Sequence, residues 1–131
     1  MLEERVIRAV IVDDEELARQ LLREQLRDAG GVEVIAECAN GFEAVKAITE
    51  VKPDVLFLDI QMPKVSGIEV LEALRGDPLT RTIPVVMLTA EAGRENVLRI
   101  AKMGVRDYLV KPFKEEQLIE KVSRVVTLVK K

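Results

Sequence analysis

The feature that most constrains the fold is the run Val55-Leu56-Phe57-Leu58, which leads directly into Asp59. Four consecutive apolar residues are typical of a strand that is buried on both faces, as in a parallel sheet covered by helices. Burying an unpaired carboxylate is costly. We therefore expect Asp59 at the carboxyl edge of the sheet, where α/β folds bind ligands. Taken alone, Asp59 could equally be a loop residue that ends a strand.

A short apolar run followed by an amphipathic helix occurs five times along the chain. Strands are expected over 8–12, 32–36, 55–58, 84–89 and 107–110. Helices are expected over 15–29, after Asn40, after Ser66, over 95–103 and over 115–130. This alternation predicts a doubly wound α/β fold, with a five-stranded parallel sheet, five helices on its two faces and right-handed crossovers.

Local signals define the helix ends. The first helix is expected to bury a stripe of leucines and to stop at Gly30-Gly31. Asn40 and Ser66 precede the second and third helices, where they are suited to cap the first turn. The leucines of that stripe are Leu17, Leu21, Leu22 and Leu26.

Length and charge bound the class of protein. The 131 residues fit one domain over 1–131. The net charge of −3 argues against a dedicated nucleic-acid module. There is no apolar run of about 18 residues that could span a membrane, and the charged N-terminus lacks the apolar region of a signal peptide. Cys38 is the one cysteine, so an internal disulfide is excluded and a cytoplasmic location is expected.

The chain contains no histidine. Catalytic sites of the Ser-His-Asp or Cys-His type and histidine zinc sites are therefore excluded. Acid–base chemistry would have to come from carboxylates, lysines or the single tyrosine, Tyr108.

Polar residues stand at the ends of four expected strands: Asp13 and Asp14, Asp59, Thr89, and Lys111. All carboxyl ends of a parallel sheet lie on one edge, so these groups should converge there. Three carboxylates repel one another unless a cation lies among them, and oxygen ligands favour Mg²⁺ or Mn²⁺. A lysine suits a phosphoryl group as a point charge. The set predicts phosphoryl chemistry with an aspartate nucleophile, although the first two aspartates could simply cap the first helix.

The strand ends carry four motifs: Val12-Asp13-Asp14-Glu15, Asp59-Ile60-Gln61-Met62-Pro63 followed by Gly67, Leu88-Thr89-Ala90, and Tyr108-Leu109-Val110-Lys111-Pro112-Phe113. In this order and at this spacing they resemble the response-regulator receiver family of two-component signalling, and the similarity covers nearly the whole chain. The resemblance implies the strand order 2-1-3-4-5, which is taken from the family. It also implies a cis peptide bond between Lys111 and Pro112.

The resemblance further implies a metal site and a nucleophile. Asp59 would take a phosphoryl group from the phosphohistidine of a histidine kinase or a histidine phosphotransfer protein. Asp14 and Asp59 would bind Mg²⁺ directly, together with the backbone carbonyl of Gln61. Asp13 would act mostly through water.

The same resemblance implies how the signal is read. Lys111, Thr89 and the backbone N–H of Ala90 would bind the phosphoryl oxygens, and Tyr108 would turn inward with Thr89. Gln61 and Glu91 fall at variable family positions that influence dephosphorylation, and Lys64 departs from an acidic residue that is common before the loop glycine. The chain would be no enzyme beyond its own phosphorylation and dephosphorylation.

Expected partners are the phosphodonor protein and a downstream effector, with no direct contact to nucleic acid or membrane. The effector would bind the face of the fourth helix, fifth strand and fifth helix; the alternative is a solvated face. That face includes Lys102, Arg106, Tyr108, Lys121 and Arg124. Gln117 replaces a glutamate that DNA-binding relatives often pair across a dimer, so a weak homodimer or a different partner is expected. The chain ends at Lys130-Lys131, which leaves a single-domain regulator or part of a longer one.

Three other classes fit the sequence less well. A phosphatase of the haloacid-dehalogenase type needs an acid two residues after the nucleophile, where Gln61 stands, and room for a cap domain. A flavin-binding module needs a phosphate loop where Asp13-Asp14-Glu15 would repel the phosphate. A degenerate receiver that only binds partners would not need the complete set of Asp14, Asp59, Thr89 and Lys111.

Overall fold

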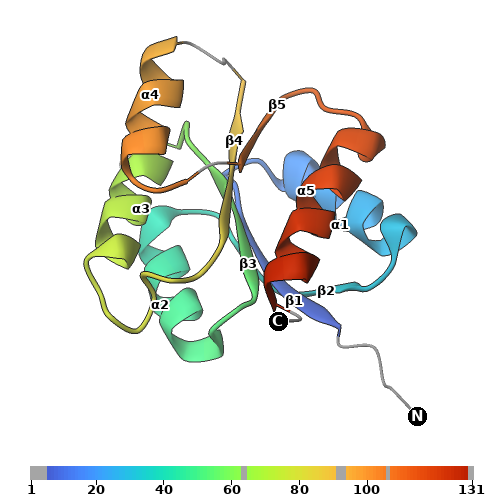
Figure 1. Ribbon diagram of the computed structural model, residues 1–131, viewed down its shortest axis with the longest axis horizontal. Helices are drawn as coiled ribbons and strands as arrows, with labels where there is room; N and C mark the ends of the chain where they lie inside the picture. The colour runs from blue at the N-terminus through green and yellow to red at the C-terminus, as the bar shows by residue number, and fades with distance from the viewer. Residues whose placement is uncertain (1–5, 63–64, 91–93, 106, 130–131) are drawn as a thin grey trace.

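The fold is a five-stranded parallel sheet flanked by helices (Figure 1), as a computed structural model describes it for residues 6–62, 65–90, 94–105 and 107–129. The strands are β1 (Ile7–Val12), β2 (Val32–Cys38), β3 (Val55–Asp59), β4 (Val85–Thr89) and β5 (Asp107–Val110). The helices are α1 (Glu16–Ala29), α2 (Gly41–Val51), α3 (Gly67–Arg75), α4 (Arg94–Lys102) and α5 (Glu115–Val129). The strand order β2-β1-β3-β4-β5 confirms the predicted topology.

The sheet separates two apolar cores. Helices α2, α3 and α4 cover one face, and α1 and α5 cover the other (Figure 1). Side chains of β3 alternate between them, because successive residues of a strand point to opposite faces. Leu56 and Leu58 pack under α2 and α3, whereas Val55 and Phe57 pack under α1 and α5. Every residue of β3 is buried, as the apolar run predicts.

The expected helix caps are present. The Asn40 side chain accepts a hydrogen bond from the Glu43 N–H at 2.9 Å, and the Ser66 hydroxyl accepts one from the Glu69 N–H at 3.3 Å. Gly30 ends α1 with a φ of 77°, a conformation that glycine adopts readily. These caps fix where α2 and α3 begin, and therefore how the loops at the carboxyl edge of the sheet run.

Of the four leucines predicted to be buried along α1, two are exposed. Leu22 and Leu26 are buried, but Leu17 and Leu21 are 76% and 56% exposed. Leu21 stands one residue before Leu22, which is a rotation of about 100° around the helix axis, and this turns it away from the sheet. The side of α1 that faces the sheet is therefore narrower than its leucines suggest.

The loop between β3 and α3 packs tightly against the end of β3. The Gly67 N–H donates to the Ile60 carbonyl at 2.9 Å. A Cβ atom on Gly67 would stand 2.1 Å from the backbone oxygen of Asp59, so only glycine fits there. This contact fixes the backbone next to Asp59.

None of the helices in the described part of the chain combines the length and the apolar character needed to cross a lipid bilayer. Pro63, Lys64, Glu91 and Arg106, which entered the expectations above, lie outside the described residues. Lys111 directly follows the last residue of β5, as expected. The predicted cis peptide bond between Lys111 and Pro112 is confirmed.

Candidate functional site

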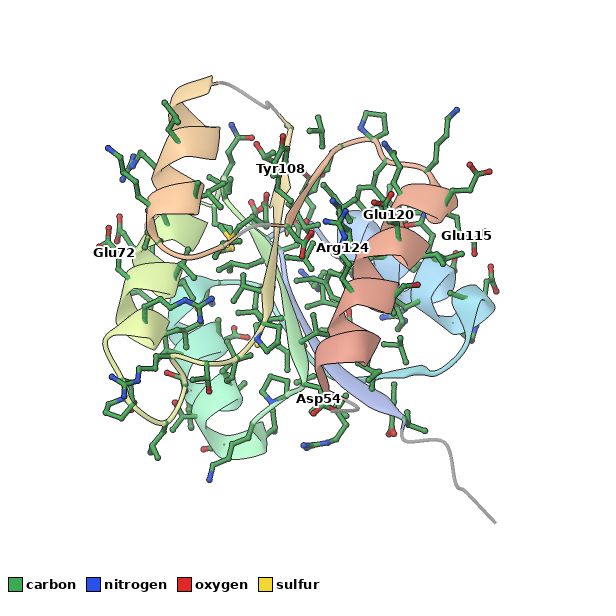
Figure 2. All side chains as sticks on the ribbon, in the orientation of Figure 1. Asp54, Glu72, Tyr108, Glu115, Glu120 and Arg124 are labelled. Atoms are coloured by element: carbon green, nitrogen blue, oxygen red, sulfur yellow. The ribbon has the colours of Figure 1, made fainter. Side chains whose placement is uncertain are left out.

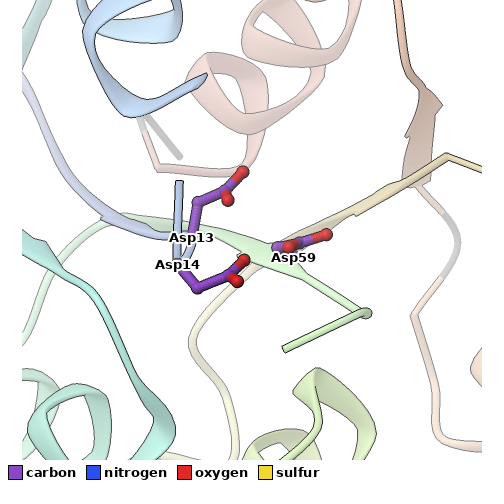
Figure 3. A group of neighbouring side chains, drawn as sticks. All are labelled: Asp13, Asp14 and Asp59. Carbon is purple, nitrogen blue, oxygen red and sulfur yellow. The ribbon is translucent and has the colours of Figure 1, made fainter. Parts of the chain in front are cut away.

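Three carboxylates meet at the carboxyl edge of the sheet. Oxygen atoms of Asp13, Asp14 and Asp59 all lie within 4.8 Å of one another (Figure 3). Asp13 and Asp14 follow β1, and Asp59 ends β3, which pairs directly with β1. Asp13 and Asp59 are buried, whereas Asp14 is exposed. Neighbouring parallel strands thus bring together residues that are far apart in the sequence.

Asp13 is bound on both carboxylate oxygens. Its Oδ1 accepts a hydrogen bond from the Glu15 N–H at 3.0 Å, and its Oδ2 lies 2.6 Å from Lys111 Nζ. The first contact is made to the N-cap residue Glu15, in the turn before α1, and not to an N–H group of the first helical turn, so Asp13 does not cap α1 as the capping alternative requires. The second contact pairs the same carboxylate with a lysine from the far end of the sheet.

Lys111 lies between two of the carboxylates. Its Nζ is 2.6 Å from Asp13 Oδ2 and 3.7 Å from Asp59 Oδ1, so Asp13 is its closer partner. Burial by itself would lower the pKa of Lys111, but the hydrogen bond to Asp13 and the charges of Asp59 and Asp13 raise it overall. The lysine is therefore positively charged at neutral pH, and it faces the carboxylate that ends β3.

Asp59 carries an unfavourable negative charge. Burial, followed by repulsion from Asp13, raises the pKa of its carboxyl group from 3.8 to about 6. Lys111 and the Gln61 N–H, which donates to Asp59 Oδ1 at 3.4 Å, act in the opposite direction. At pH 7 the carboxylate is still about 90% ionised. Its charge is poorly compensated, and such a carboxylate gains from a nearby cation.

Gln61 lies two residues beyond Asp59, with its side chain exposed and its backbone N–H at the Asp59 carboxylate. The peptide backbone of this turn therefore runs beside the three carboxylates. Met62, the next residue, is buried in the core under α2 and α3. This anchors the turn to the body of the domain.

Thr89 and Tyr108 come from the two strands beyond β3. Thr89 ends β4 and is buried. Its strand pairs with β3 in a register that sets Asp59 opposite Leu88, so Thr89 lies at the same edge as the carboxylates. Tyr108 on β5 is half-buried and packs against the core that α2, α3 and α4 cover (Figure 2). The two residues thus occupy adjacent strands on the β4–β5 side of the site.

Arg19 is a site residue that the sequence reasoning missed. Its Nη1 donates to the backbone carbonyl of Asp13 at 2.7 Å. The side chain belongs to α1 and is 16% exposed. A basic residue little more than one turn after an acidic pair, on the helix that this pair introduces, is the signal that could have pointed to it.

The face of α4, β5 and α5 is less basic than expected. Arg124 Nη1 and Lys121 Nζ lie 2.6 Å and 3.5 Å from Asp107 Oδ1, and Arg124 also pairs with Glu120, which Figure 2 labels beside it. These two basic side chains are therefore neutralised within the domain. Lys102 is exposed.

Gln117 has a local role. Its Oε1 accepts a hydrogen bond from the Lys114 N–H at 2.9 Å, so it caps the start of α5. The amide is engaged within its own helix, as in a capping box.

Cys38 is buried at the end of β2. Burial, together with repulsion from Glu43, raises the pKa of its thiol to about 11. The thiol is therefore neutral at physiological pH, and a role as a nucleophile is disfavoured.

Comparison with known proteins agrees with this geometry. The family model of the response regulator receiver domain matches residues 9–123. The transcriptional regulatory protein BtsR of Salmonella typhi is 42% identical over 120 residues, which are 92% of this chain and 48% of that protein. An uncharacterized response regulatory protein of Vibrio cholerae serotype O1 is 41% identical over 126 residues, or 96% and 51%. The chain thus spans about half the length of the curated relatives it matches.

Solved structures share the fold. The chemotaxis protein CheY4 of Vibrio cholerae superposes with a TM-score of 0.81 and 33% identity, covering 92% of this chain and 98% of that one. A putative response regulator from Chloroflexus aurantiacus gives a TM-score of 0.86 and 33% identity, covering 94% and 99%. The likeness extends over nearly the whole of both solved chains.

Proposed function

Because the chain belongs to the response regulator receiver family, a signalling module of two-component systems, we propose that Asp59 accepts a phosphoryl group from a histidine kinase or a histidine phosphotransfer protein. One observation carries the assignment. Oxygen atoms of Asp59, Asp13 and Asp14 lie within 4.8 Å of one another, and Lys111 Nζ lies 3.7 Å from Asp59 Oδ1. This arrangement joins a nucleophile, an oxygen ligand set and a fixed positive charge at one point of the sheet.

The carboxylates fit a hard divalent cation. The donor set consists of oxygen atoms. Burial, followed by repulsion from Asp13, raises the pKa of Asp59 more than Lys111 lowers it, so a cation beside this carboxylate would relieve an unfavourable charge. Asp14 and Asp59 would hold Mg²⁺ directly with the Gln61 carbonyl, and Asp13, already paired with Lys111, would act through water. When bound, Mg²⁺ would offset the negative charge that gathers when a phosphoryl group approaches the carboxylates.

In the proposed step, a carboxylate oxygen of Asp59 forms a bond to phosphorus while the bond between phosphorus and the donor's imidazole nitrogen breaks. The electron pair of the broken bond stays on that nitrogen, which takes a proton from water. Lys111, Thr89 and the Ala90 N–H would hold the phosphoryl oxygens. Attack of water on phosphorus later breaks the bond between phosphorus and the Asp59 oxygen, which keeps the electron pair as a carboxylate, and inorganic phosphate is released. The chain would therefore act only on its own phosphoryl group.

Phosphorylation would act by shifting an existing equilibrium between two forms of the domain. Receiver domains interact with histidine kinases and with output effectors. We infer that Thr89 and Tyr108, on the adjacent strands β4 and β5, connect the phosphoryl group to the face of α4, β5 and α5. Two basic side chains of this face already pair with Asp107. An effector would therefore bind by shape and apolar contact more than by charge.

The proposal includes one receiver domain over 1–131, with a weak homodimer or a heterologous partner rather than a tight dimer. Gln117 supports this, because its side chain caps α5. Sedimentation with and without beryllofluoride, a phosphoryl mimic, tests the assembly. A tight dimer in both states would contradict it.

The phosphorylation itself is tested with acetyl phosphate as a small phosphodonor. Incubation with Mg²⁺ should give a labile phosphoprotein, and a chelator should prevent its formation. The matched control is Asp28→Asn, which changes an exposed carboxylate of α1 and should not affect the reaction. Phosphorylation at the same rate in the presence of the chelator would contradict the proposed cation site.

A further inference from the structure

Asp13 is held at all of its polar atoms. Its N–H donates to the Cys38 carbonyl at 3.0 Å, its carbonyl accepts from Arg19 Nη1 at 2.7 Å, its Oδ1 accepts from the Glu15 N–H at 3.0 Å, and its Oδ2 accepts from Lys111 Nζ at 2.6 Å. Among these four contacts, Arg19 is the side chain with no part in the proposed phosphoryl transfer. Because its hydrogen bond is made to a backbone carbonyl, Arg19 acts on the backbone conformation at Asp13.

Arg19 is itself fixed from the other side. Its Nε lies 3.5 Å from Glu37 Oε1, on the edge strand β2, and the other carboxylate oxygen of Glu37 pairs with Arg23. A guanidinium group holds several donors in one rigid plane, so it can join two acceptors in a set geometry. Arg19 thus connects α1, β2 and the loop that carries the acidic pair.

The carbonyl that Arg19 holds belongs to the peptide unit between Asp13 and Asp14. A peptide unit is planar, so the direction of this carbonyl also sets the position of the Asp14 nitrogen and Cα. Asp14 is exposed, and no hydrogen bond or ion pair of its carboxylate occurs among the described residues. The place of its carboxylate therefore depends mainly on the backbone that Arg19 orients.

We propose that Arg19 is a positioning residue for the cation site, which it serves by fixing the peptide unit that aims Asp14 at Asp59. The inference rests on the proposed function, because it assumes that Asp14 and Asp59 bind Mg²⁺. Groups that orient metal ligands from outside typically contribute a factor of about 10–100 to metal affinity. Since Arg19 acts through backbone, Arg19→Gln should weaken Mg²⁺ binding by about 10-fold, at the lower end of that range.

The control is Arg23→Gln. Arg23 lies on the same helix and pairs with the same Glu37, but it makes no contact with Asp13 among the described residues. Its replacement should leave Mg²⁺ affinity unchanged. Arg19→Lys keeps the charge but not the planar set of donors, so its affinity should lie between those of wild type and Arg19→Gln.

The experiment is a calorimetric titration of Mg²⁺ into wild type and these three variants. The Mg²⁺ dependence of phosphorylation by acetyl phosphate is measured in parallel. We expect Arg19→Gln to raise the Mg²⁺ concentration at half-maximal rate while the rate at saturating Mg²⁺ stays near that of wild type. A general structural defect would lower the saturating rate as well. If Arg19→Gln and Arg23→Gln bind Mg²⁺ equally, the inference is overturned.

Should Arg19→Gln fail to fold in a thermal melt, Arg19→Lys and Glu37→Gln carry the test. Arg19→Lys removes the planar set of donors that reaches both Asp13 and Glu37, and Glu37→Gln removes the charge that holds the guanidinium group from β2. Wild-type affinity in both would also overturn the inference. Failure of the proposed function has a different signature, since wild type would then show no Mg²⁺ binding at all. That result would overturn both proposals.

Discussion

Asp59→Asn should stabilise the metal-free protein. Asp59 is 4% exposed, and burial, followed by repulsion from Asp13, raises the pKa of its carboxyl group from 3.8 to about 6. One pKa unit corresponds to about 1.36 kcal/mol, so ionisation of Asp59 costs the folded state about 3 kcal/mol above pH 6. An asparagine has nearly the same shape and carries no charge, and its amide oxygen can still accept the Gln61 N–H. The free energy of unfolding should therefore rise by up to about 3 kcal/mol in neutral solution.

The gain should depend on pH with a definite sign. Between pH 3.8 and about 6 the folded protein holds a proton on Asp59 that the unfolded chain has lost. The unfolded state binds fewer protons in this window, so the stability contributed by Asp59 is complete below it and is lost as pH rises through it. Asp59→Asn removes this loss. The difference in unfolding free energy between Asp59→Asn and wild type should thus be near zero at about pH 4 and reach its plateau above pH 6.

The assay is urea unfolding followed by circular dichroism, with a chelator present, at several pH values across this window. Asp28→Asn, which replaces an exposed carboxylate, is the matched control and should show no comparable gain. The reasoning is refuted if Asp59→Asn is no more stable than wild type at neutral pH, or if its gain is the same at every pH. Added Mg²⁺ should then stabilise wild type and not the variant.

Three further outcomes follow from the same geometry. Asp14→Ala should abolish the rise of melting temperature with Mg²⁺. If the melting temperature of this variant rises with Mg²⁺ as much as that of wild type, the cation binds elsewhere. Lys111→Ala should still be phosphorylated to some extent, but beryllofluoride should no longer shift the amide signals around Tyr108. A shift as large as in wild type would show that Lys111 does not transmit the signal to Tyr108. Gly67→Ala should cost about 3 kcal/mol or more in urea unfolding, since its Cβ would stand 2.1 Å from a backbone oxygen. Gly76→Ala, with 3.4 Å to its nearest neighbour, is the control and should cost far less.

The central part of the fold could be predicted because its signals are local. The apolar run before Asp59 specifies a buried strand wherever it is placed, and Asn40 and Ser66 cap helices by contacts within three residues. The convergence of Asp13 with Asp59 also followed, since parallel strands share one edge. The strand order came from family resemblance, because alternation alone does not say which strand lies beside which.

What the sequence did not reveal depends on side-chain direction and distant pairing. Leu21 and Leu22 are the same residue type on the same helix, and the rotation of α1 about its own axis, as it packs on the sheet, decides which one is buried. Lys111 was expected to face the phosphoryl site, but its preference for Asp13 depends on differences of about one ångström between partners far apart in sequence. Arg19 was missed because its partner is a backbone carbonyl, which no side-chain pattern marks.

The most direct test of the account is the intact mass of the protein after incubation with acetyl phosphate and Mg²⁺. Wild type should gain the mass of one phosphoryl group, and Asp59→Asn should gain none, although it folds and is the more stable of the two. Phosphorylation of Asp59→Asn to the wild-type extent, or the absence of any adduct on wild type, would contradict the assignment of Asp59 as the phosphoryl acceptor.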